Sequence, residues 1–343
     1  MRALVLEAPN SPFILTDVPD PTAGPGEAVA KVLACGSGLT IQHTKVGRSP
    51  VLMPRIIGHE ITAEIVEIGA GVSSLEIGDP VTAHYYLFCG YCRQCLSGYE
   101  SLCENLKGQI GKACDGGYAE YIKLPSRNFI KLPEGLDYKR YPAEVGVISD
   151  ALATPLKVLR RGRVRRRDTV AVFGAGGGLG IHQVMMAKWA GAHVIAVDVA
   201  TDKLAACSKV GADDVVDAST CNVADALTDL TNGRGLDVAI DYVCNTATLG
   251  TAIQALGPQG RLVTLGGAGH DAQVALGVFR QSEKEILASR YVSRREIIDA
   301  LEIVAHGEVW PMVTDIRPMT QAEDLHALIE QGRITGRAAL LIA

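Results

Sequence analysis

Four cysteines stand within fifteen residues of this 343-residue chain: Cys89, Cys92, Cys95 and Cys103. Cysteines two residues apart on a tight turn can direct their sulfur atoms at a common centre about 2.3 Å away, and four thiolates complete the tetrahedral coordination of zinc. A saturated site of this kind leaves no position for a substrate. The spacing therefore predicts a structural zinc loop that the rest of the fold must accommodate.

Two other uses of these cysteines fit the sequence less well. Bacterial ferredoxins also begin with Cys-x2-Cys-x2-Cys, but their fourth cysteine follows after three residues and precedes a proline. Here the last gap is seven residues, and Glu104 follows Cys103. Disulfides are disfavoured because the nine cysteines are an odd number and the start of the chain has no secretory pattern. We therefore expect zinc.

The length and composition indicate an ordinary globular protein. At 48% hydrophobic and 21% charged residues, the chain is long enough for two domains with separate cores. It has no signal sequence and no apolar run near the length of a membrane span, so we expect a cytoplasmic protein without membrane contact. The net charge of -5 gives no general attraction to nucleic acid. The basic segment 160–167 is interpreted as a solvated linker, with a clamp for an anionic substrate such as a CoA thioester as the alternative.

The texture of the sequence changes near residue 154. Before it, segments such as 28–34 and 61–68 alternate β-branched and polar residues between Pro and Gly, which predicts short antiparallel strands in a barrel-like half. After it, strands alternate with helices, which predicts a parallel sheet covered on both faces. A last helix is expected at 296–305, and the end at 332–342 has strand-like texture and is expected to pack on the first domain. The strands expected in the second half are 169–173, 193–197, 214–216, 236–241 and 261–265, with helices at 185–190, 202–209 and 246–256.

A glycine-rich turn lies between the first strand and helix of this second half. Glycines there let the backbone approach a pyrophosphate, and the helix N-terminus favours its charge, although the run is one residue longer than the strict dinucleotide fingerprint. Asp198 ends the next strand and can accept hydrogen bonds from both ribose hydroxyls, while repelling a 2′-phosphate, which predicts NAD rather than NADP. Lys203 either reaches the same ribose or is an exposed helix lysine. The candidate residues of the turn are Gly174, Gly176, Gly177, Gly178, Leu179 and Gly180.

Three further fragments, at 34–40, 57–60 and 115–121, complete a pattern that runs through nearly the whole chain. With the cysteine quartet and the glycine turn, in this order, they resemble the zinc-dependent alcohol dehydrogenases of the medium-chain dehydrogenase/reductase superfamily. The resemblance implies an α/β protein with two domains. Residues 1–149 and 288–343 would form a GroES-like β-barrel catalytic domain carrying the structural-zinc lobe, and residues 150–287 a doubly wound, parallel-sheet Rossmann domain that binds NAD.

The resemblance also implies a second, catalytic zinc. Its ligands map onto Cys35, His59 and Asp150, the last standing where most relatives have cysteine. The exchange preserves the charge of the ligand set. Taken singly, these residues could be a small buried side chain, a core histidine and a helix N-cap. Glu60 is expected to orient a ligand or to replace one transiently, and an ordinary ion pair is the alternative.

The reaction implied is reversible hydride transfer between a primary or secondary alcohol and NAD, giving an aldehyde or ketone. In the family the proton leaves through a hydroxyl two residues after the first ligand, which is Ser37 here, and then often through a histidine. That histidine position holds Thr40, and the usual aspartate position holds Gly38. A hydroxyl can pass on a proton but is not a base near neutral pH, so His43 is a candidate substitute, or simply a loop histidine.

The remaining roles also come from the resemblance. Thr154 is expected beside the nicotinamide, Arg337 near the pyrophosphate, and Tyr85 in the substrate pocket, unless it only packs around the zinc loop. The expected partners are a small alcohol or carbonyl compound and further copies of the chain, as a tetramer or dimer. Two alternatives stay open: a specialised relative acting on a polyol or a CoA-linked hydroxy-acyl substrate, and a non-catalytic structural paralogue.

Overall fold

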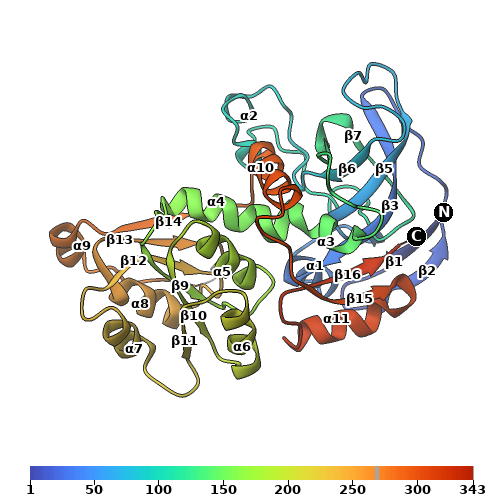
Figure 1. Ribbon diagram of the computed structural model, residues 1–343. Helices are drawn as coiled ribbons and strands as arrows, with labels where there is room; N and C mark the ends of the chain where they lie inside the picture. The colour runs from blue at the N-terminus through green and yellow to red at the C-terminus, as the bar shows by residue number, and fades with distance from the viewer. Residues whose placement is uncertain (267–269, 343) are drawn as a thin grey trace. The chain divides into compact units, whose positions relative to one another are not determined.

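The chain forms two compact units in a computed structural model that describes residues 1–266 and 270–342 (Figure 1). One unit comprises Met1–Ala153 and Val292–Ala343, and the other comprises Thr154–Tyr291. Both divisions fall a few residues after the positions expected from the sequence. Among the described residues, no helix is long and apolar enough to cross a membrane.

The first unit is built around a mainly antiparallel sheet with the strand order β15-β16-β3-β5-β6-β8, to which β7 adds by pairing with β3. Its longest strand, β3 (Glu27–Ser37), pairs antiparallel with β5 (Glu60–Ile68), and most side chains of both are buried. The other strands of the sheet are β6 (Pro80–Ala83), β7 (Tyr121–Pro125), β8 (Phe129–Lys131), β15 (Val313–Pro318) and β16 (Arg337–Leu341). A second sheet consists of β1 (Arg2–Leu6), β2 (Ile14–Asp17) and β4 (Arg55–Ile56).

The end of the chain completes this first unit. As expected, the C-terminal strand β16 returns to it, pairing antiparallel with β3. Two features were not expected: β15 pairs parallel with β16, and a helix, α11 (Ala322–Glu330), lies between them in sequence. Helix α11 buries Ala322, Leu325, His326 and Ile329, a helical spacing that is present in the sequence.

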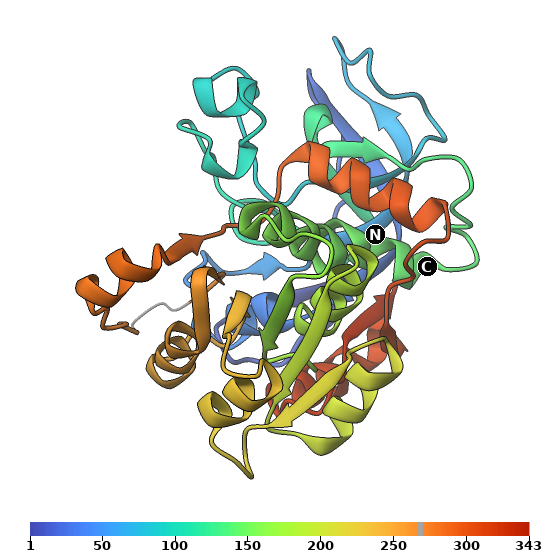
Figure 2. The same cartoon turned by 60° about the vertical axis from the view of Figure 1, so that its left-hand side comes forward.

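The other helices of this unit are short, apart from α10 (Arg294–Ala305), which begins with a capping box between Ser293 and Glu296. Helix α3 (Pro142–Val147) continues directly into a wide helical turn, Ile148–Leu152, that carries Asp150. Helix α1 (Leu39–Lys45) follows β3. The cysteine segment holds only α2 (Arg93–Leu96) and a single turn at Glu100–Leu102, and Figure 2 shows it as a cyan loop apart from the strands of the sheet.

The second unit has a six-stranded parallel sheet with the order β11-β10-β9-β12-β13-β14. The order reverses at the first strand, β9, as in a doubly wound dinucleotide-binding sheet. Alternate side chains of the strands pack against α7 and α8 to form one apolar core. The strands are β9 (Thr169–Phe173), β10 (His193–Asp198), β11 (Asp214–Asp217), β12 (Leu236–Asp241), β13 (Leu256–Thr264) and β14 (Glu285–Ala288). The helices are α4 (Ala153–Gly162), α5 (Gly180–Trp189), α6 (Thr201–Lys209), α7 (Val223–Leu230), α8 (Thr246–Ala255) and α9 (Leu276–Ser282).

Candidate active site

The four cysteines of the loop converge on one point. The sulfur atoms of Cys89, Cys92, Cys95 and Cys103 all lie within 4.8 Å of one another. Three of the sulfur–sulfur distances are 3.5, 3.9 and 3.9 Å, and the edge of a tetrahedron with zinc–sulfur bonds of 2.3 Å is about 3.8 Å. All four cysteines are free, so no disulfide competes for them. The donor set and its spacing fit a zinc ion that has no open position.

The loop lowers the pKa of two of these thiols, Cys89 and Cys92, whereas burial raises the pKa of Cys95 and Cys103. The backbone N–H groups of Cys89 and Cys92 donate to the sulfurs of Cys103 and Cys89, at 3.3 and 3.4 Å. Burial opposes ionisation, but backbone hydrogen bonds from Tyr91 and Cys92 outweigh it and lower the pKa of Cys89 to about 6. Phe88 packs against the cluster. The loop therefore has a small core made of the metal-binding residues themselves.

A second group of ligand atoms lies deeper in the first unit. Side-chain atoms of His59, Glu60 and Asp150 approach within 4.8 Å of one another, and all three residues are buried. His59 Nε2 is 3.5 Å from Asp150 Oδ2 and 3.9 Å from Glu60 Oε1. This nitrogen is buried and forms no hydrogen bond. A buried imidazole nitrogen without a hydrogen bond, facing carboxylates, is the arrangement that a metal ion completes.

Cys35 lies close to this group without belonging to it. Its Sγ points toward the backbone of Gly58 and Gly117, where added Cβ atoms would lie 2.9 and 3.1 Å from the sulfur. Among the described residues, Cys35 is in no group of ligand atoms that all lie within 4.8 Å. Burial, and then the charge of Glu60, raise the pKa of the thiol. Binding of one ion by Cys35, His59 and Asp150 therefore requires these ligand atoms to come closer together and the thiol to lose its proton.

Arg337 is placed among the acidic residues of this cluster. Its guanidinium contacts both carboxylate oxygens of Glu60, with Nε 3.0 Å from Oε2, and its Nη2 lies 3.3 Å from Asp150 Oδ2. The two carboxylates raise the pKa of Arg337 against the opposing effect of its burial, and burial raises the pKa of Glu60. A Cβ atom on Gly38 would lie 2.5 Å from Arg337 Nη1, so this glycine makes room for the guanidinium.

Aromatic and hydroxyl side chains adjoin the cluster. The ring of Tyr85 lies on that of His59, with 4.0 Å between centroids and 31° between planes. Ser37 follows Cys35 by two residues on β3, so their side chains share one face of the strand. Thr40 is exposed on α1. His43 lies on the same helix, where burial, and then Arg48, lower its pKa and weaken it as a base.

The glycine turn of the second unit is held by the acidic residue predicted to bind ribose. Asp198 Oδ2 accepts a hydrogen bond of 2.8 Å from the N–H of Gly176, and its Oδ1 accepts one of 2.8 Å from the N–H of Val199. Lys203 packs over the turn, since a Cβ atom added to Gly176 would lie 2.3 Å from the Cβ atom of Lys203. A Cβ atom on Gly180 would lie 2.0 Å from a backbone oxygen, so α5 can start here only with glycine. Thr154 is buried on α4.

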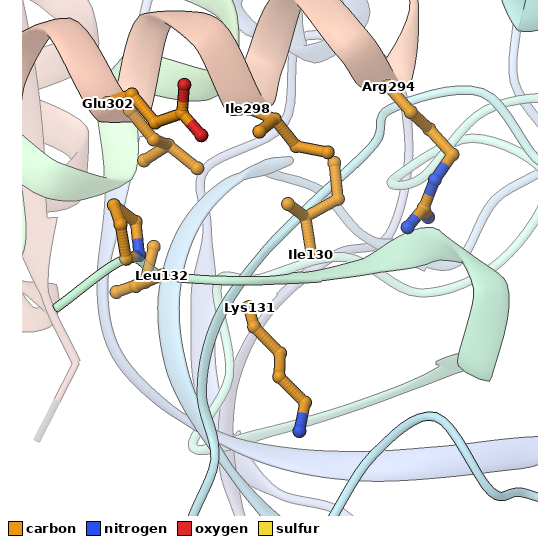
Figure 3. A pocket seen from close by; sticks show the side chains of 8 residues that line it. Ile130, Lys131, Leu132, Arg294, Ile298 and Glu302 are labelled. Carbon is orange, nitrogen blue, oxygen red and sulfur yellow. The ribbon is translucent and has the colours of Figure 1, made fainter.

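A cavity of about 390 Å³ in the first unit is lined by none of these residues (Figure 3). It opens between β8 and α10, beside Ile130, Ile298 and Glu302. The guanidinium of Arg294 borders the cavity, and its Nη1 donates a hydrogen bond of 3.3 Å to the backbone oxygen of Phe129. The cavity contains no candidate ligand or cofactor residue.

Comparison with known proteins identifies the family. Residues 24–134 match the alcohol dehydrogenase GroES-like domain, and residues 178–306 match the zinc-binding dehydrogenase domain. An alcohol dehydrogenase of Geobacillus stearothermophilus is 32% identical over 99% of this chain and 98% of its own. The chain belongs to the zinc-dependent alcohol dehydrogenase family.

Two further relatives refine the comparison within this alcohol dehydrogenase family. A solved NAD-dependent alcohol dehydrogenase superposes with a TM-score of 0.90 at 28% identity, covering all of both chains. An L-threonine 3-dehydrogenase of Pyrococcus horikoshii is 33% identical over 78% of this chain and 76% of its own. The family resemblance and the fold class predicted from the sequence are confirmed.

The sequence did not indicate every residue that bears on the site. Tyr118 is hydrogen-bonded to Ser37, and His326 is hydrogen-bonded to Tyr118. Tyr118 belongs to the fragment 115–121, which indicates the family but not a role for this tyrosine. The sequence gave no sign that His326, more than 200 residues later, would reach it.

Proposed function

We propose that this chain is a zinc- and NAD-dependent alcohol dehydrogenase that transfers a hydride reversibly between a primary or secondary alcohol and NAD. The observation that carries the proposal is the buried Nε2 of His59, which has no hydrogen bond and faces the carboxylates of Asp150 and Glu60. In a member of this family, such a nitrogen is best explained as a ligand of the catalytic metal.

The local charges support zinc at this position. With Cys35 as thiolate, Cys35, Glu60 and Asp150 carry three negative charges, and the buried Arg337 offsets one of them. Two negative charges then remain to oppose one divalent cation. Thiolate, imidazole and carboxylate are also the ligand types that zinc takes in catalytic sites. A second zinc would be held by the four cysteines of the loop.

When bound, zinc would supply the Lewis acidity that lowers the pKa of an alcohol, and NAD would supply the hydride acceptor. The side chains divide the remaining work. The oxygen of Ser37 would accept a hydrogen bond from the hydroxyl of the alcohol, and Tyr85 fixes the ring of His59 by stacking on it. Glu60 and Arg337 keep Asp150 in place through the buried ion pairs. Thr40 is too exposed to guide a proton through a dry path.

The glycine turn and Asp198 are the proposed site of the dinucleotide. Asp198 retains a carboxylate at the end of β10, and hydrogen bonds from the backbone hold it against the turn. A 2′-phosphate at that position would meet its negative charge, so we propose NAD as the preferred cofactor. A tenfold preference for NADPH in steady-state kinetics would overturn this assignment.

The substrate is proposed at the level of its class. The likeness to an L-threonine 3-dehydrogenase adds an amino-acid secondary alcohol to the candidates. The CoA alternative depends on the basic segment 160–167, and part of that segment is already used within the second unit: Arg161 Nε donates to Ala288 O at 3.2 Å, and Arg163 pairs with Glu285. This favours the linker interpretation.

One experiment tests the function and separates it from its alternatives. Purified protein is analysed for zinc and then assayed with NAD against primary and secondary alcohols, L-threonine, polyols and hydroxyacyl-CoA esters. Two zinc ions per chain and NADH formation from a simple alcohol or threonine are expected. Oxidation of a CoA ester alone, lost when Arg165–Arg167 are neutralised, would favour the specialised relative. Zinc without turnover of any alcohol or carbonyl would favour the structural paralogue.

We also propose a homo-oligomer, tetramer or dimer, as expected from the family resemblance. Large apolar side chains on the cysteine loop are exposed, among them Tyr91 at 70% and Leu96 at 76%, which suits a surface covered in an assembly. Light scattering on the purified chain measures the mass of the assembly, and a monomer mass would contradict the proposed oligomer. The cytoplasmic location stays a prediction from the sequence.

A further inference from the structure

A buried chain of hydrogen bonds leads from Ser37 to the surface. Ser37 Oγ lies 2.5 Å from the hydroxyl of Tyr118, which lies 2.9 Å from His326 Nε2. His326 Nδ1 lies 2.7 Å from Gln42 Oε1, and Gln42 Nε2 donates to Glu330 Oε2 at 2.9 Å. The first four residues are at most 3% exposed, and only Glu330 reaches solvent.

The outer end of this chain fixes the direction of its hydrogen bonds. The Glu330 carboxylate is paired with Arg48, and the hydrogen bond from Gln42 lowers its pKa, so it is ionised and can only accept. Gln42 must then turn its NH2 group toward Glu330 and its carbonyl oxygen toward His326. The Nδ1 of His326 therefore carries a hydrogen.

The inner end follows from the same reasoning. Burial, and then Lys45, lower the pKa of His326 to about 3, so the imidazole is neutral and its Nε2 has no hydrogen. That nitrogen accepts the single hydrogen of the Tyr118 hydroxyl. The phenolic oxygen can then only accept from Ser37. The hydroxyl hydrogen of Ser37 points at Tyr118, and the lone pairs of Ser37 Oγ remain available to another hydrogen-bond donor.

Ser37 lies next to Cys35, a candidate ligand of the catalytic metal, so the direction of its hydroxyl hydrogen bears on the substrate. Ser37 shares a face of β3 with Cys35, two residues before it. The ring of Tyr118 adjoins the same sulfur, because a Cβ atom on Gly58 would lie 2.6 Å from Tyr118 Cδ1 and 2.9 Å from Cys35 Sγ. Ser37 is thus at the metal-binding end of the hydrogen-bond chain, and Glu330 is at the solvent end.

We propose that Tyr118 and His326 are positioning residues that keep the hydrogen of Ser37 directed away from the substrate, so that the oxygen of Ser37 is ready to accept a hydrogen bond from the hydroxyl of the alcohol and to orient it. This role rests on the proposed function. It gives this chain a device for orienting the hydroxyl of Ser37 that does not depend on Thr40, which stands where relatives often have a histidine. The positioning residues come from the segment before β7 and from α11.

The Tyr118→Phe variant removes one hydroxyl and keeps the ring. We expect kcat for alcohol oxidation to fall about tenfold with KM changed less than twofold, because the hydroxyl of Ser37 loses its fixed direction. Tyr138→Phe is the matched control. It also removes a tyrosine hydrogen bond within the first unit, to Glu64, and should leave kcat unchanged. Equal kcat in Tyr118→Phe and the wild type would overturn the role.

A double-mutant cycle separates positioning from a general loss of stability. His326→Leu should lower kcat about as much as Tyr118→Phe, and it should have no further effect in the Tyr118→Phe background, since His326 acts only through Tyr118. His326→Gln, which can accept from Tyr118 and donate to Gln42, should recover most of the rate. Additive losses, or no recovery by Gln, would show that His326 has only a structural role.

A measurement without metal, cofactor or substrate tests the direction of the hydrogen bonds. In 15N-histidine-labelled protein, the His326 signal, identified by its loss in His326→Gln, should show a hydrogen on Nδ1 and none on Nε2. A hydrogen on Nε2 would reverse the chain and overturn the proposal. A wild-type chain that oxidises no alcohol would overturn the proposed function, whereas an active wild type with an unaffected Tyr118→Phe variant would overturn the positioning role alone.

Discussion

Replacing Arg337 by Met tests whether buried charges hold the catalytic cluster together. The guanidinium is 6% exposed and contacts Glu60, which is fully buried, and Asp150, which is 10% exposed. Methionine fills much of the same space without charge or donors. In the metal-free protein, the Arg337→Met variant therefore leaves two carboxylates buried beside each other with no cation.

The magnitude follows from this geometry. Removing one partner of a buried ion pair lowers the free energy of unfolding by about 3–5 kcal/mol, because the remaining charge is desolvated without an opposite charge beside it. A surface pair costs about 1 kcal/mol or less. Arg317, whose Nε and Nη2 are both 2.8 Å from oxygens of Asp315, offers that comparison, since its side chain is 23% exposed. We expect Arg337→Met to lower the free energy of unfolding several times more than Arg317→Met.

The pH dependence of the loss has a definite sign. Burial raises the pKa of Glu60 in the folded state, and Arg337 opposes that rise. Without Arg337 the folded pKa rises further above the ordinary value of 4.5. A carboxyl with a raised folded pKa favours the folded state at pH values below its unfolded pKa, and this contribution is lost as the pH rises through the folded pKa. The deficit of the variant should therefore be small near pH 4.5 and grow toward pH 8.

Urea unfolding of chelator-treated protein between pH 5 and 8 measures these differences. The Arg337→Met/Glu60→Gln double variant should recover part of the stability at pH 8, because one of the two unpaired charges is gone. If Arg337→Met and Arg317→Met lose equal stability at pH 8, or if the deficit shrinks as the pH rises, the cluster is not held by buried ion pairing and the reasoning fails.

Three further predictions concern the metals and the cofactor. Cys103→Ser should lower the zinc content from two ions to one and reduce thermal stability by several degrees, whereas Cys221→Ser, at an exposed cysteine, should change neither. Equal effects of the two variants in metal analysis and calorimetry would contradict a zinc loop. His59→Ala should retain the circular dichroism of the wild type and the loop zinc but lose turnover at least a thousandfold; a substantial residual kcat would remove His59 from the metal site. Asp198→Ala should raise the KM for NAD about tenfold and lower the ratio of kcat/KM for NAD to kcat/KM for NADP. If steady-state kinetics showed this ratio unchanged, Asp198 would only support the turn at Gly176.

The sequence was most informative where local spacing determines the chemistry. The cysteine quartet is complete within one loop, so its convergence could be predicted from the spacing alone. The parallel sheet could be predicted because five of its strands and three of its helices carry apolar patterns of their own, whereas α4, α7, α9 and β14 were not predicted, and α9 buries none of its side chains. The turn from Gly174 to Gly180 was recognised because it lies between a strand and a helix, and the structure shows the same order, β9 and then α5.

The sequence was least informative where residues far apart in the chain meet. Nothing local indicates that Arg337 is buried against Glu60, or that Tyr118 is hydrogen-bonded to His326. These contacts depend on where β16 and α11 pack, which the pattern of one segment does not determine. The family resemblance suggested Arg337 for the pyrophosphate, and that role stays a prediction beside the ion pairs that the structure shows.

The proposed catalytic site is therefore assembled from both ends of the chain. Strand β16 begins at Arg337 and pairs with the part of β3 that carries Cys35 and Ser37. Before β16 is in place, Glu60 has no cation to offset its charge, and the buried cluster would be strongly unfavourable. We expect the ligand cluster to form only after the C-terminal strand has paired with β3, because the charge that stabilises it arrives with that strand. The long sequence separation of these contacts makes this a late step in folding.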